Sequence, residues 1–438
     1  MKTDMPPLSI LLIGAGAREH ALAWKLSGEA GVGRLVCAPG NPGMAQVAEI
    51  ADVAVDDYPG LLGLVDREGF DLVVVGPEAP LAAGLADALL DRGVPVFGPT
   101  QGAARLEASK GFTKAFCDRH GIPTADYQLF EALDAAVAHL EARAERGDSG
   151  PYVLKADGLA AGKGVVIAED ADAARAALEE MFGGRFGEAG ATVVIEDFLE
   201  GEEVSFFAVS DGQTAWPLLA AQDHKRVGEG DTGPNTGGMG AYSPAPVWTP
   251  ELEREVMETI IGPTVSGMRG EGHEFRGVLF AGLMVTEGGP KLIEYNVRFG
   301  DPECQVLMRR MASELAPLLL ACALGDLSDT EPPAWFGEPC VNVVMATQGY
   351  PGAYEKGSVI RGVEEAEALD GVVVFQAGTR VGRNCGRLKA NGGRVLSVTA
   401  VGETLPEAVE RAYGAVDSID WPEGFVRRDI GWRALGRG

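Results

Sequence analysis

The N-terminal part of the chain alternates between short apolar runs and amphipathic stretches. An apolar run at 8–14 is followed by a glycine-rich turn, an amphipathic stretch through residue 26 and a second apolar run at 34–40. Further apolar runs lie at 71–75 and 94–97. Uninterrupted apolar runs separated by helical stretches are typical of buried parallel strands. The pattern predicts an open parallel sheet with helices on its faces.

The middle of the chain predicts a different architecture. A helix is expected over 103–120, stopped at Gly121. Strands over 152–156 and 164–167 are so close together that they predict a hairpin or flap around a glycine-rich stretch. Further strands, with no helices between them, are expected over 192–196, 204–209, 277–285 and 291–295. Such a series favours an α+β lobe.

The end of the chain predicts a linker and a small α/β lobe. Residues 326–339 are rich in Pro, Asp and Glu, as linkers are. Beyond them we expect three short strands and a final helix, over 341–347, 372–376, 394–399 and 405–418.

Length and charge narrow the class of protein. A chain of 438 residues exceeds one hydrophobic core, so several lobes with a cleft between them are expected. The net charge of -27 opposes binding to nucleic acid or to an anionic membrane surface. The apolar stretch at 8–13 is too short to span a bilayer, and no feature indicates an obligate protein partner. The six cysteines are scattered singly, which favours reduced thiols and a cytoplasmic protein.

The glycine-rich turn Gly14–His20 follows the first predicted strand, where backbone N–H groups at a helix start can hold a phosphate. It departs from the dinucleotide fingerprint, because Glu19 replaces the third glycine and the second strand ends without an acidic residue for a ribose. NAD binding is therefore disfavoured. A tight structural turn and a phosphate site for another ligand remain open.

A second candidate is the stretch KADGLAAGKG at 155–164, which carries Lys155 and Lys163. Glycine lets backbone N–H groups approach phosphate oxygens, and lysine supplies charge. The glycine spacing is not that of a P-loop, and a plain surface hairpin is the alternative. About ten of the 37 basic residues are lysines, and five of these fall in candidate motifs: Lys110, Lys114, Lys155, Lys163 and Lys225.

Two acidic segments are further candidates. Residues 196–203 read EDFLEGEE and by themselves favour an exposed acidic turn. On a strand, Glu294, Asn296 and Arg298 would alternate onto one face. A carboxylate, an amide oxygen and a guanidinium together suit Mg²⁺ and the phosphate that it bridges. The alternative is a polar sheet face with an internal salt bridge.

The last candidate combines QDHKRV at 222–227 with GPNTGGMGAYSP at 233–244. A loop so rich in glycine is costly to order, so it is expected to lie against a ligand or another backbone. His224 alone would be structural. Beside Lys225 and Arg226 in so acidic a chain, it favours an anion site.

Together these segments resemble the ATP-grasp enzymes and, among them, the phosphoribosylamine-glycine ligase (glycinamide ribonucleotide synthetase) family. The likeness runs over essentially the whole chain and is carried by REHALAWK, APGN, VGPEAPL, FGPT, KADGLAAGKGV, QDHKRV, DTGPNTGGMGAYSP, NVRFGDPE, NGGRVL and DIGWRA. Ala17 and Ala390 depart from the family's usual residues.

The resemblance implies a set of site residues. ATP would be bound by Lys110, Lys155, Gly162, Lys163, Gly164, Glu196, Leu199 and Glu203. Mg²⁺ or Mn²⁺ would be bound by Glu294 and Asn296, and the catalytic residues would be Arg298 and Lys155. The substrates would be bound by Gly16, Asp223, Lys225, Arg226, Asn235, Gly237 and Arg298.

The resemblance also implies a domain division and a reaction. The expected domains are a Rossmann-like N-terminal domain, an ATP-grasp core in two segments, an ATP-grasp flap and a C-terminal α/β lobe, over 1–103, 104–124 with 192–327, 125–191 and 328–438. The expected reaction converts ATP, glycine and 5-phosphoribosylamine to ADP, phosphate and glycinamide ribonucleotide through glycyl phosphate. The rival functions are another ATP-grasp ligase, an NAD-dependent oxidoreductase and a non-catalytic nucleotide-binding module.

Overall fold

The N-terminal lobe is a five-stranded, fully parallel sheet with strand order β3-β2-β1-β4-β5. The computed structural model describes residues 6–159, 164–185, 187–382 and 386–436. The strands of this lobe are β1 (Leu8–Gly14), β2 (Val32–Pro39), β3 (Glu49–Ile50), β4 (Leu72–Val75) and β5 (Val96–Phe97). Its helices are α1 (Ala17–Ser27), η1 (Met44–Gln46), α2 (Tyr58–Glu68), α3 (Glu78–Ala82) and α4 (Leu85–Leu90). The predicted parallel sheet is confirmed.

The helix expected over 103–120 is two helices, α5 (Gln101–Ala108) and α6 (Lys110–His120). Ser109 separates them with extended backbone angles, φ -138° and ψ 114°, and its hydroxyl accepts a hydrogen bond from the N–H of Phe112 at 3.0 Å. Serine favours such caps over helix interiors, so the single-helix prediction was wrong. The break places Lys110 in the first turn of α6. The helix ends at Gly121, as predicted, with φ 66°.

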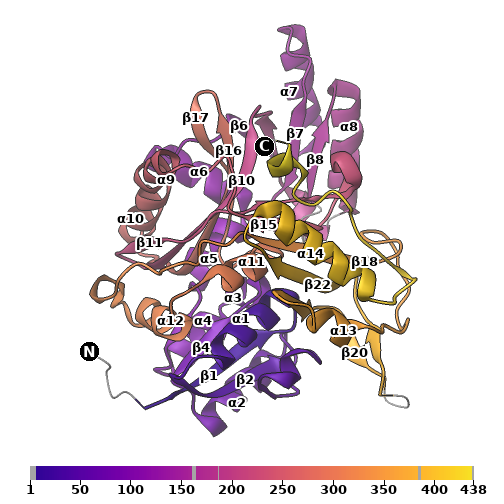
Figure 1. The fold of residues 1–438 in the computed structure, drawn as a ribbon. Helices are drawn as coiled ribbons and strands as arrows, with labels where there is room; N and C mark the ends of the chain where they lie inside the picture. The colour runs from indigo at the N-terminus through magenta and orange to yellow at the C-terminus, as the bar shows by residue number, and fades with distance from the viewer. Residues whose placement is uncertain (1–5, 160–163, 186, 383–385, 437–438) are drawn as a thin grey trace.

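A second sheet, with order β6-β9-β7-β8, forms a lid that stands away from the body of the protein (Figure 1). β7 and β8 pair as the predicted antiparallel hairpin. The lid consists of β6 (Tyr127–Phe130), α7 (Leu133–Glu145), β7 (Tyr152–Ala156), β8 (Val165–Ala168), α8 (Ala171–Glu180), η2 (Met181–Arg185), η3 (Gly187–Ala191) and β9 (Val193–Asp197). α7 and α8 share a buried apolar cluster with β7 and β9.

The central lobe is an antiparallel sheet with order β11-β10-β16-β17. Its strands are β10 (Glu202–Asp211), β11 (Ala215–Pro217), β16 (Arg276–Thr286) and β17 (Gly289–Asn296). The helical segments α9 (Pro250–Val256), η5 (Met257–Ile261) and α10 (Gly262–Gly270) lie between these strands in sequence, so the expectation that no helix intervenes was wrong. The antiparallel pairing still gives the predicted α+β lobe.

The C-terminal sheet, with order β12-β15-β18-β22-β19, takes two strands from the middle of the sequence. Its strands are β12 (Gln222–Asp223), β15 (Gly240–Ser243), β18 (Cys340–Thr347), β19 (Val372–Gln376), β22 (Arg394–Val401) and the short β23 (Gly424–Phe425). A long-range pairing of β15 with β18 therefore crosses the expected domain boundary. The predicted bounds of the domains remain a prediction.

Smaller elements complete the chain. The hairpins are β13 (Arg226–Gly228) with β14 (Thr232–Asn235), and β20 (Thr379–Val381) with β21 (Leu388–Ala390). The remaining helices are η4 (Glu229–Asp231), α11 (Glu303–Arg310), α12 (Leu315–Leu324), η6 (Leu327–Asp329), α13 (Val363–Glu367), α14 (Leu405–Ser418) and α15 (Trp432–Leu435). The expected linker is mostly irregular. The helix predicted over 405–418 is α14, but it is not the final helix, because α15 follows it.

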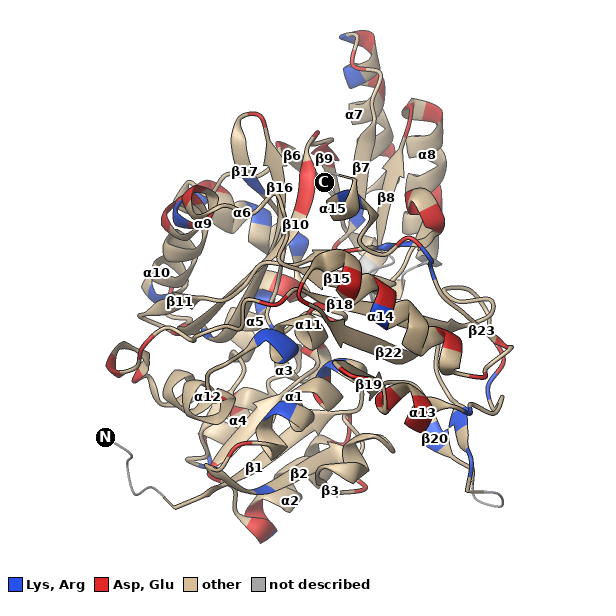
Figure 2. Cartoon of the chain, in the orientation of Figure 1, with Lys and Arg blue, Asp and Glu red and all other residues tan. Residues whose placement is uncertain are grey.

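Apolar packing joins the lobes. One buried cluster contains both Leu11 of β1 and Phe206 of β10, so the N-terminal and central lobes share a core. Acidic residues are spread over outer helices such as α8, α13 and α14 (Figure 2). None of the helices within the described ranges is both long and apolar enough to cross a membrane.

Candidate active site

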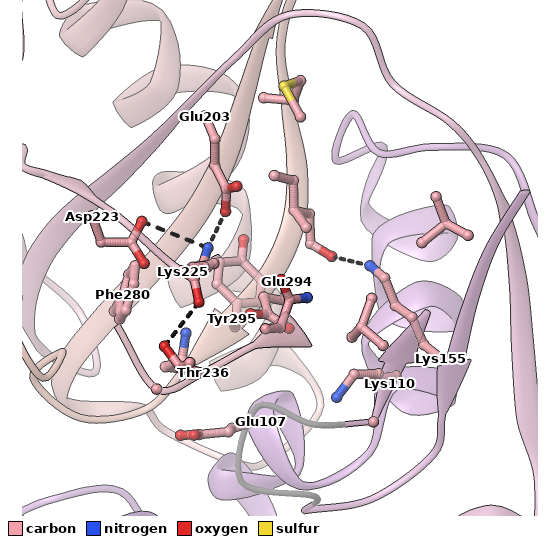
Figure 3. Close-up of a pocket in the computed structure, with 18 of the residues that line it drawn as sticks. Glu107, Lys110, Lys155, Glu203, Asp223, Lys225, Thr236, Phe280, Glu294 and Tyr295 are labelled. Atoms are coloured by element: carbon pink, nitrogen blue, oxygen red, sulfur yellow. Dashed lines mark hydrogen bonds and ion pairs between the residues drawn. The ribbon is translucent and has the colours of Figure 1, made fainter. Parts of the chain in front are cut away.

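A cavity of about 550 Å³ lies where the lid, the central sheet and the N-terminal lobe meet. Figure 3 shows Lys110 and Lys155 on one side of it, Glu203, Asp223 and Lys225 on the opposite side, and Glu294 between them. Most residues proposed from the sequence line this cavity: Lys110, Lys155, Gly164, Glu196, Leu199, Glu203, Asp223, Lys225, Arg226, Asn235, Gly237, Glu294, Asn296 and Arg298. Segments far apart in sequence thus meet at one site.

The lysine side of the cavity is built from α6 and β7. Lys155 is buried, with its ammonium 2.9 Å from Glu196 Oε1 and donating to the carbonyl of Ile293 at 2.9 Å. Lys110 lies at the start of α6 and has no hydrogen bond or ion pair with any described residue. These ammonium groups supply positive charge where an anionic ligand would enter.

The hinge side of the cavity is apolar. Glu196 and Leu199 lie at the end of β9 and just beyond it, which is where the lid joins the central sheet. The apolar side chains along this wall are Val153, Val165, Ile167, Phe198, Leu199 and Met284. Gly158, with φ 141°, and Gly164 bring the lid backbone to the cavity edge, so these residues are more than a surface hairpin. Gly162 and Lys163 lie outside the described residues.

β17 presents the proposed metal ligands. Glu294 and Asn296 are two positions apart on the strand and both line the cavity. Burial acts to raise the pKa of Glu294, but Lys110, Lys225 and Lys155 outweigh it and lower that pKa. Neither side chain has a hydrogen bond or ion pair with a described residue. An ionised carboxylate and an amide oxygen that are both unengaged fit a hard cation such as Mg²⁺.

Arg298 lies two residues beyond the end of β17, so the expectation that it shares the strand was wrong. Two carboxylates hold its guanidinium. Arg298 Nη2 lies 2.7 Å from Glu107 Oε1, and Nε lies 3.1 Å from Glu78 Oε2. Burial acts to raise the pKa of Glu78, but Arg298 and Arg18 lower it to about 2. Burial raises the pKa of Glu107. Glu78 comes from the N-terminal lobe, so Arg298 is oriented across a lobe interface.

The opposite wall is acidic around one lysine. The Lys225 ammonium pairs with Glu203 and lies 3.8 Å from Asp223 Oδ1 (Figure 3). Burial acts to lower the pKa of Lys225, but Asp223, Glu203 and Glu294 outweigh it and raise that pKa. Burial raises the pKa of Asp223 to about 7. This wall offers carboxylates to a cationic or hydroxyl-bearing ligand.

The glycine-dense loop closes the cavity below this wall. Arg226 donates to the carbonyl of Gly233 at 2.7 Å, and Arg394 of β22 donates to the carbonyl of Gly237 at 2.6 Å. Gly238, with φ 109°, packs so closely that an added Cβ would lie 2.4 Å from Pro302 Cδ. The loop therefore lies against another part of the backbone as well as the cavity, as the sequence predicted.

Two sequence predictions lie outside this cavity. Gly16 is not among the described residues that line it, and its N–H donates to Glu19 Oε2 at 2.7 Å. Its role in substrate binding stays a prediction. His224 is fully buried, accepts from the N–H of Gly431 at 3.3 Å, and its pKa is lowered to about 3 by burial and by Arg433. It is a neutral structural residue and does not bind an anion.

Several lining residues were missed from the sequence, namely Arg18, Glu78, Glu107, Asp301, Glu303, Arg394 and Arg433. The sequence could have indicated Glu78, because it lies just beyond the predicted strand at 71–75. Residues just beyond the carboxyl ends of parallel strands commonly line ligand sites. The others reach the cavity through lobe packing. Among the described residues no cluster of three or more His, Cys, Asp or Glu could hold a metal.

Sequence comparison covers nearly the whole chain. Residues 8–107, 108–304 and 340–433 match the N domain, the ATP-grasp (A) domain and the C domain of phosphoribosylglycinamide synthetase. The chain is 57% identical to a phosphoribosylamine–glycine ligase of Caulobacter vibrioides and 56% identical to one of Mesorhizobium japonicum, each over 98% of this chain and 99% of the relative.

Structural comparison agrees. A crystal structure of phosphoribosylamine–glycine ligase from Thermotoga maritima superposes with a TM-score of 0.82 at 32% identity, covering 97% of this chain and all of that one. A biotin carboxylase from Campylobacter jejuni gives a TM-score of 0.70 at 15% identity, over 96% of this chain and 94% of that one, which shows a shared fold alone.

Proposed function

Because this chain belongs to the phosphoribosylglycinamide synthetase family, we propose that its cavity joins glycine to 5-phosphoribosylamine, with ATP converted to ADP and phosphate. The chain is an ATP-dependent ligase that forms a C–N bond, and its reaction belongs to purine biosynthesis. Its ATP-grasp domain binds ATP. The residues assigned to each ligand, the metal and the intermediate are part of the proposal.

One observation carries this function: a single cavity gathers two lysine ammonium groups, two unengaged oxygen ligands and an oriented guanidinium. Lys110 and Lys155 line the cavity together with Glu294 and Asn296, and Arg298 lies two residues beyond the end of their strand. This combination suits transfer of a terminal phosphoryl group to a carboxylate, because the charge to be stabilised is on the phosphoryl oxygens.

We assign the nucleotide to the lid side. The adenine ring suits the apolar wall at Leu199, and Lys110 and Lys155 suit the phosphates. Glu203 stays the candidate for the ribose hydroxyls, although it now pairs with Lys225 and would have to share that contact. Gly158 and Gly164 support a lid backbone close enough to cover the phosphates.

Glu294 and Asn296 would hold Mg²⁺ or Mn²⁺, which supplies charge neutralisation to the bound phosphates. Arg298 contacts the carboxylate of glycine. A carboxylate oxygen attacks the γ-phosphorus, ADP leaves, and glycyl phosphate forms. The amine of 5-phosphoribosylamine then attacks the acyl carbon, the new C–N bond forms, and phosphate departs with the former carboxylate oxygen while the amine loses a proton. Asp223, Arg226, Asn235 and Gly237 are the remaining substrate-binding candidates.

An isotope experiment can test whether the carboxylate oxygen of glycine leaves with phosphate. Glycine labelled with ¹⁸O in its carboxylate should transfer one labelled oxygen to inorganic phosphate per turnover, with ADP as the nucleotide product. Label in AMP, or unlabelled phosphate, would exclude the acyl phosphate route. Omitting glycine or ribosylamine should stop ADP release, and a panel of other acids and amines separates this ligase from other ATP-grasp enzymes.

We also propose that the protein works in the cytoplasm. The five described cysteines, Cys37, Cys117, Cys304, Cys322 and Cys340, are buried free thiols, which suits a reducing compartment.

A further inference from the structure

Lys114 is the lysine of the candidate motifs to which neither the sequence analysis nor the proposed function assigns a ligand. It lies on α6 and is 3% exposed, and it is not among the residues that line the main cavity. Burying an ammonium is costly unless it is paired and hydrogen-bonded, so its position requires a reason.

The Lys114 ammonium is fully engaged by the protein. It donates to Thr124 Oγ1 at 2.7 Å and to the carbonyl of Ala125 at 3.3 Å, and it lies 2.9 Å from Glu196 Oε2. An ammonium has three N–H groups, and these three acceptors account for all of them. Lys114 therefore has no donor left for a ligand.

Glu196 connects Lys114 to the cavity. Its carboxylate is buried, with Oε2 on Lys114 and Oε1 2.9 Å from Lys155. Lys155 has one further acceptor, the carbonyl of Ile293, which precedes Glu294. At least one N–H of Lys155 is thus free for a ligand in the cavity. Lys114 therefore contacts Glu196, Glu196 contacts Lys155, and Lys155 lines the cavity.

The charges of this chain of contacts explain why two lysines are needed. Glu196 holds the Lys155 ammonium in place, but a one-to-one pair would be neutral and would attract a phosphate weakly. With Lys114 on the other oxygen, two ammonium groups and one carboxylate leave one net positive charge. Electrostatic attraction at a partly dry site depends strongly on that net charge.

We propose that Lys114 is a positioning residue for ATP: by neutralising Glu196, it leaves the ammonium of Lys155 both fixed and electrostatically available to the nucleotide phosphates. This inference rests on the proposed role of Lys155 in ATP binding. It also changes the role of Glu196, whose carboxylate serves the lysines, so that only its backbone remains for the adenine.

The test is a comparison of ATP affinity between variants, measured by calorimetric titration of the full-length enzyme with MgATP. Lys114→Met removes the charge and keeps the length of the side chain. It should weaken ATP binding roughly 10- to 100-fold, because the net positive charge of Lys114, Glu196 and Lys155 together is lost. The KM for glycine should stay within about threefold, since Arg298 and its carboxylates do not contact this chain of residues.

A second variant distinguishes a loss of charge from a loss of folded structure. In Lys114→Met/Glu196→Gln both the buried cation and its partner are neutral, so Lys155 regains its net charge, and ATP affinity should recover most of the loss. Normal ATP affinity in Lys114→Met, or no recovery in the double variant, would each overturn the proposal. If Lys155→Met itself leaves ATP binding unchanged, the assignment of Lys155 fails instead.

Discussion

His20 predicts a specific loss of stability in mild acid. It lies on α1 and is 6% exposed, and its Nδ1 accepts a hydrogen bond from the backbone N–H of Gln376 on β19 at 2.8 Å. Nδ1 must therefore be unprotonated in the folded protein. Burial lowers the pKa of His20 to about 4, whereas an unfolded histidine titrates near its ordinary value of about 6.5.

Proton linkage gives the direction in which the free energy of unfolding changes with pH. The folded-state pKa lies below the unfolded one, so the unfolded chain binds a proton first and stability falls as the pH drops through 6.5 toward 4. Each pH unit below about 6.5 costs about 1.4 kcal/mol, so going from pH 7.5 to pH 5 should remove about 2 kcal/mol through His20 alone.

The matched variant is His20→Asn, whose amide oxygen keeps an acceptor near the position of Nδ1 but does not titrate. Urea unfolding followed by circular dichroism at pH 7.5 and pH 5 gives the free energy of unfolding of both proteins. His224, whose pKa is lowered to about 3, is present in both and cancels. The difference between wild type and variant should shrink or reverse by about 2 kcal/mol at pH 5. A difference that does not depend on pH would refute the reasoning.

Three further predictions concern the cavity. Glu294→Gln should lower turnover roughly 100-fold and raise the Mg²⁺ concentration needed, with an unchanged circular dichroism spectrum; normal Mg²⁺ dependence would rule out metal ligation. Arg298→Lys loses the fork that Glu78 and Glu107 hold, so kcat/KM for glycine should fall roughly 10- to 100-fold while the KM for ATP changes little; equal changes for both substrates would contradict its placement. Gly158→Val places a β-branched residue at φ 141°, so the KM for ATP should rise and kcat should fall together, whereas a change in thermal stability alone would make the loop purely structural.

Local pattern alone determined much of the fold. The continuous apolar run of β1 and the amphipathic run of α14 were predicted with their bounds, because burial on both faces of a strand and one apolar helix face leave signatures in consecutive residues. The sequence likewise predicted that Glu294, Asn296 and Arg298 meet at one place. All three line the cavity, although only Glu294 and Asn296 lie on the strand.

Tertiary structure decided what depends on distant neighbours. The pairing of β15 with β18 joins segments roughly a hundred residues apart, and no local pattern records such a partner. The hydrogen bond from the N–H of Gly16 to Glu19, and the burial that lowers the pKa of His224, also depend on the folded structure.

Distant neighbours also give the two lysines of α6 different surroundings. In the sequence Lys110 and Lys114 are alike, four residues apart and both cationic. In the structure one faces the cavity and the other is enclosed by Thr124, Ala125 and Glu196. Sequence pattern determines which residue types are present and which face of an element they share. Which charges are paired, buried or left free depends on the groups that packing brings within a few ångströms, and those come from other elements of the fold.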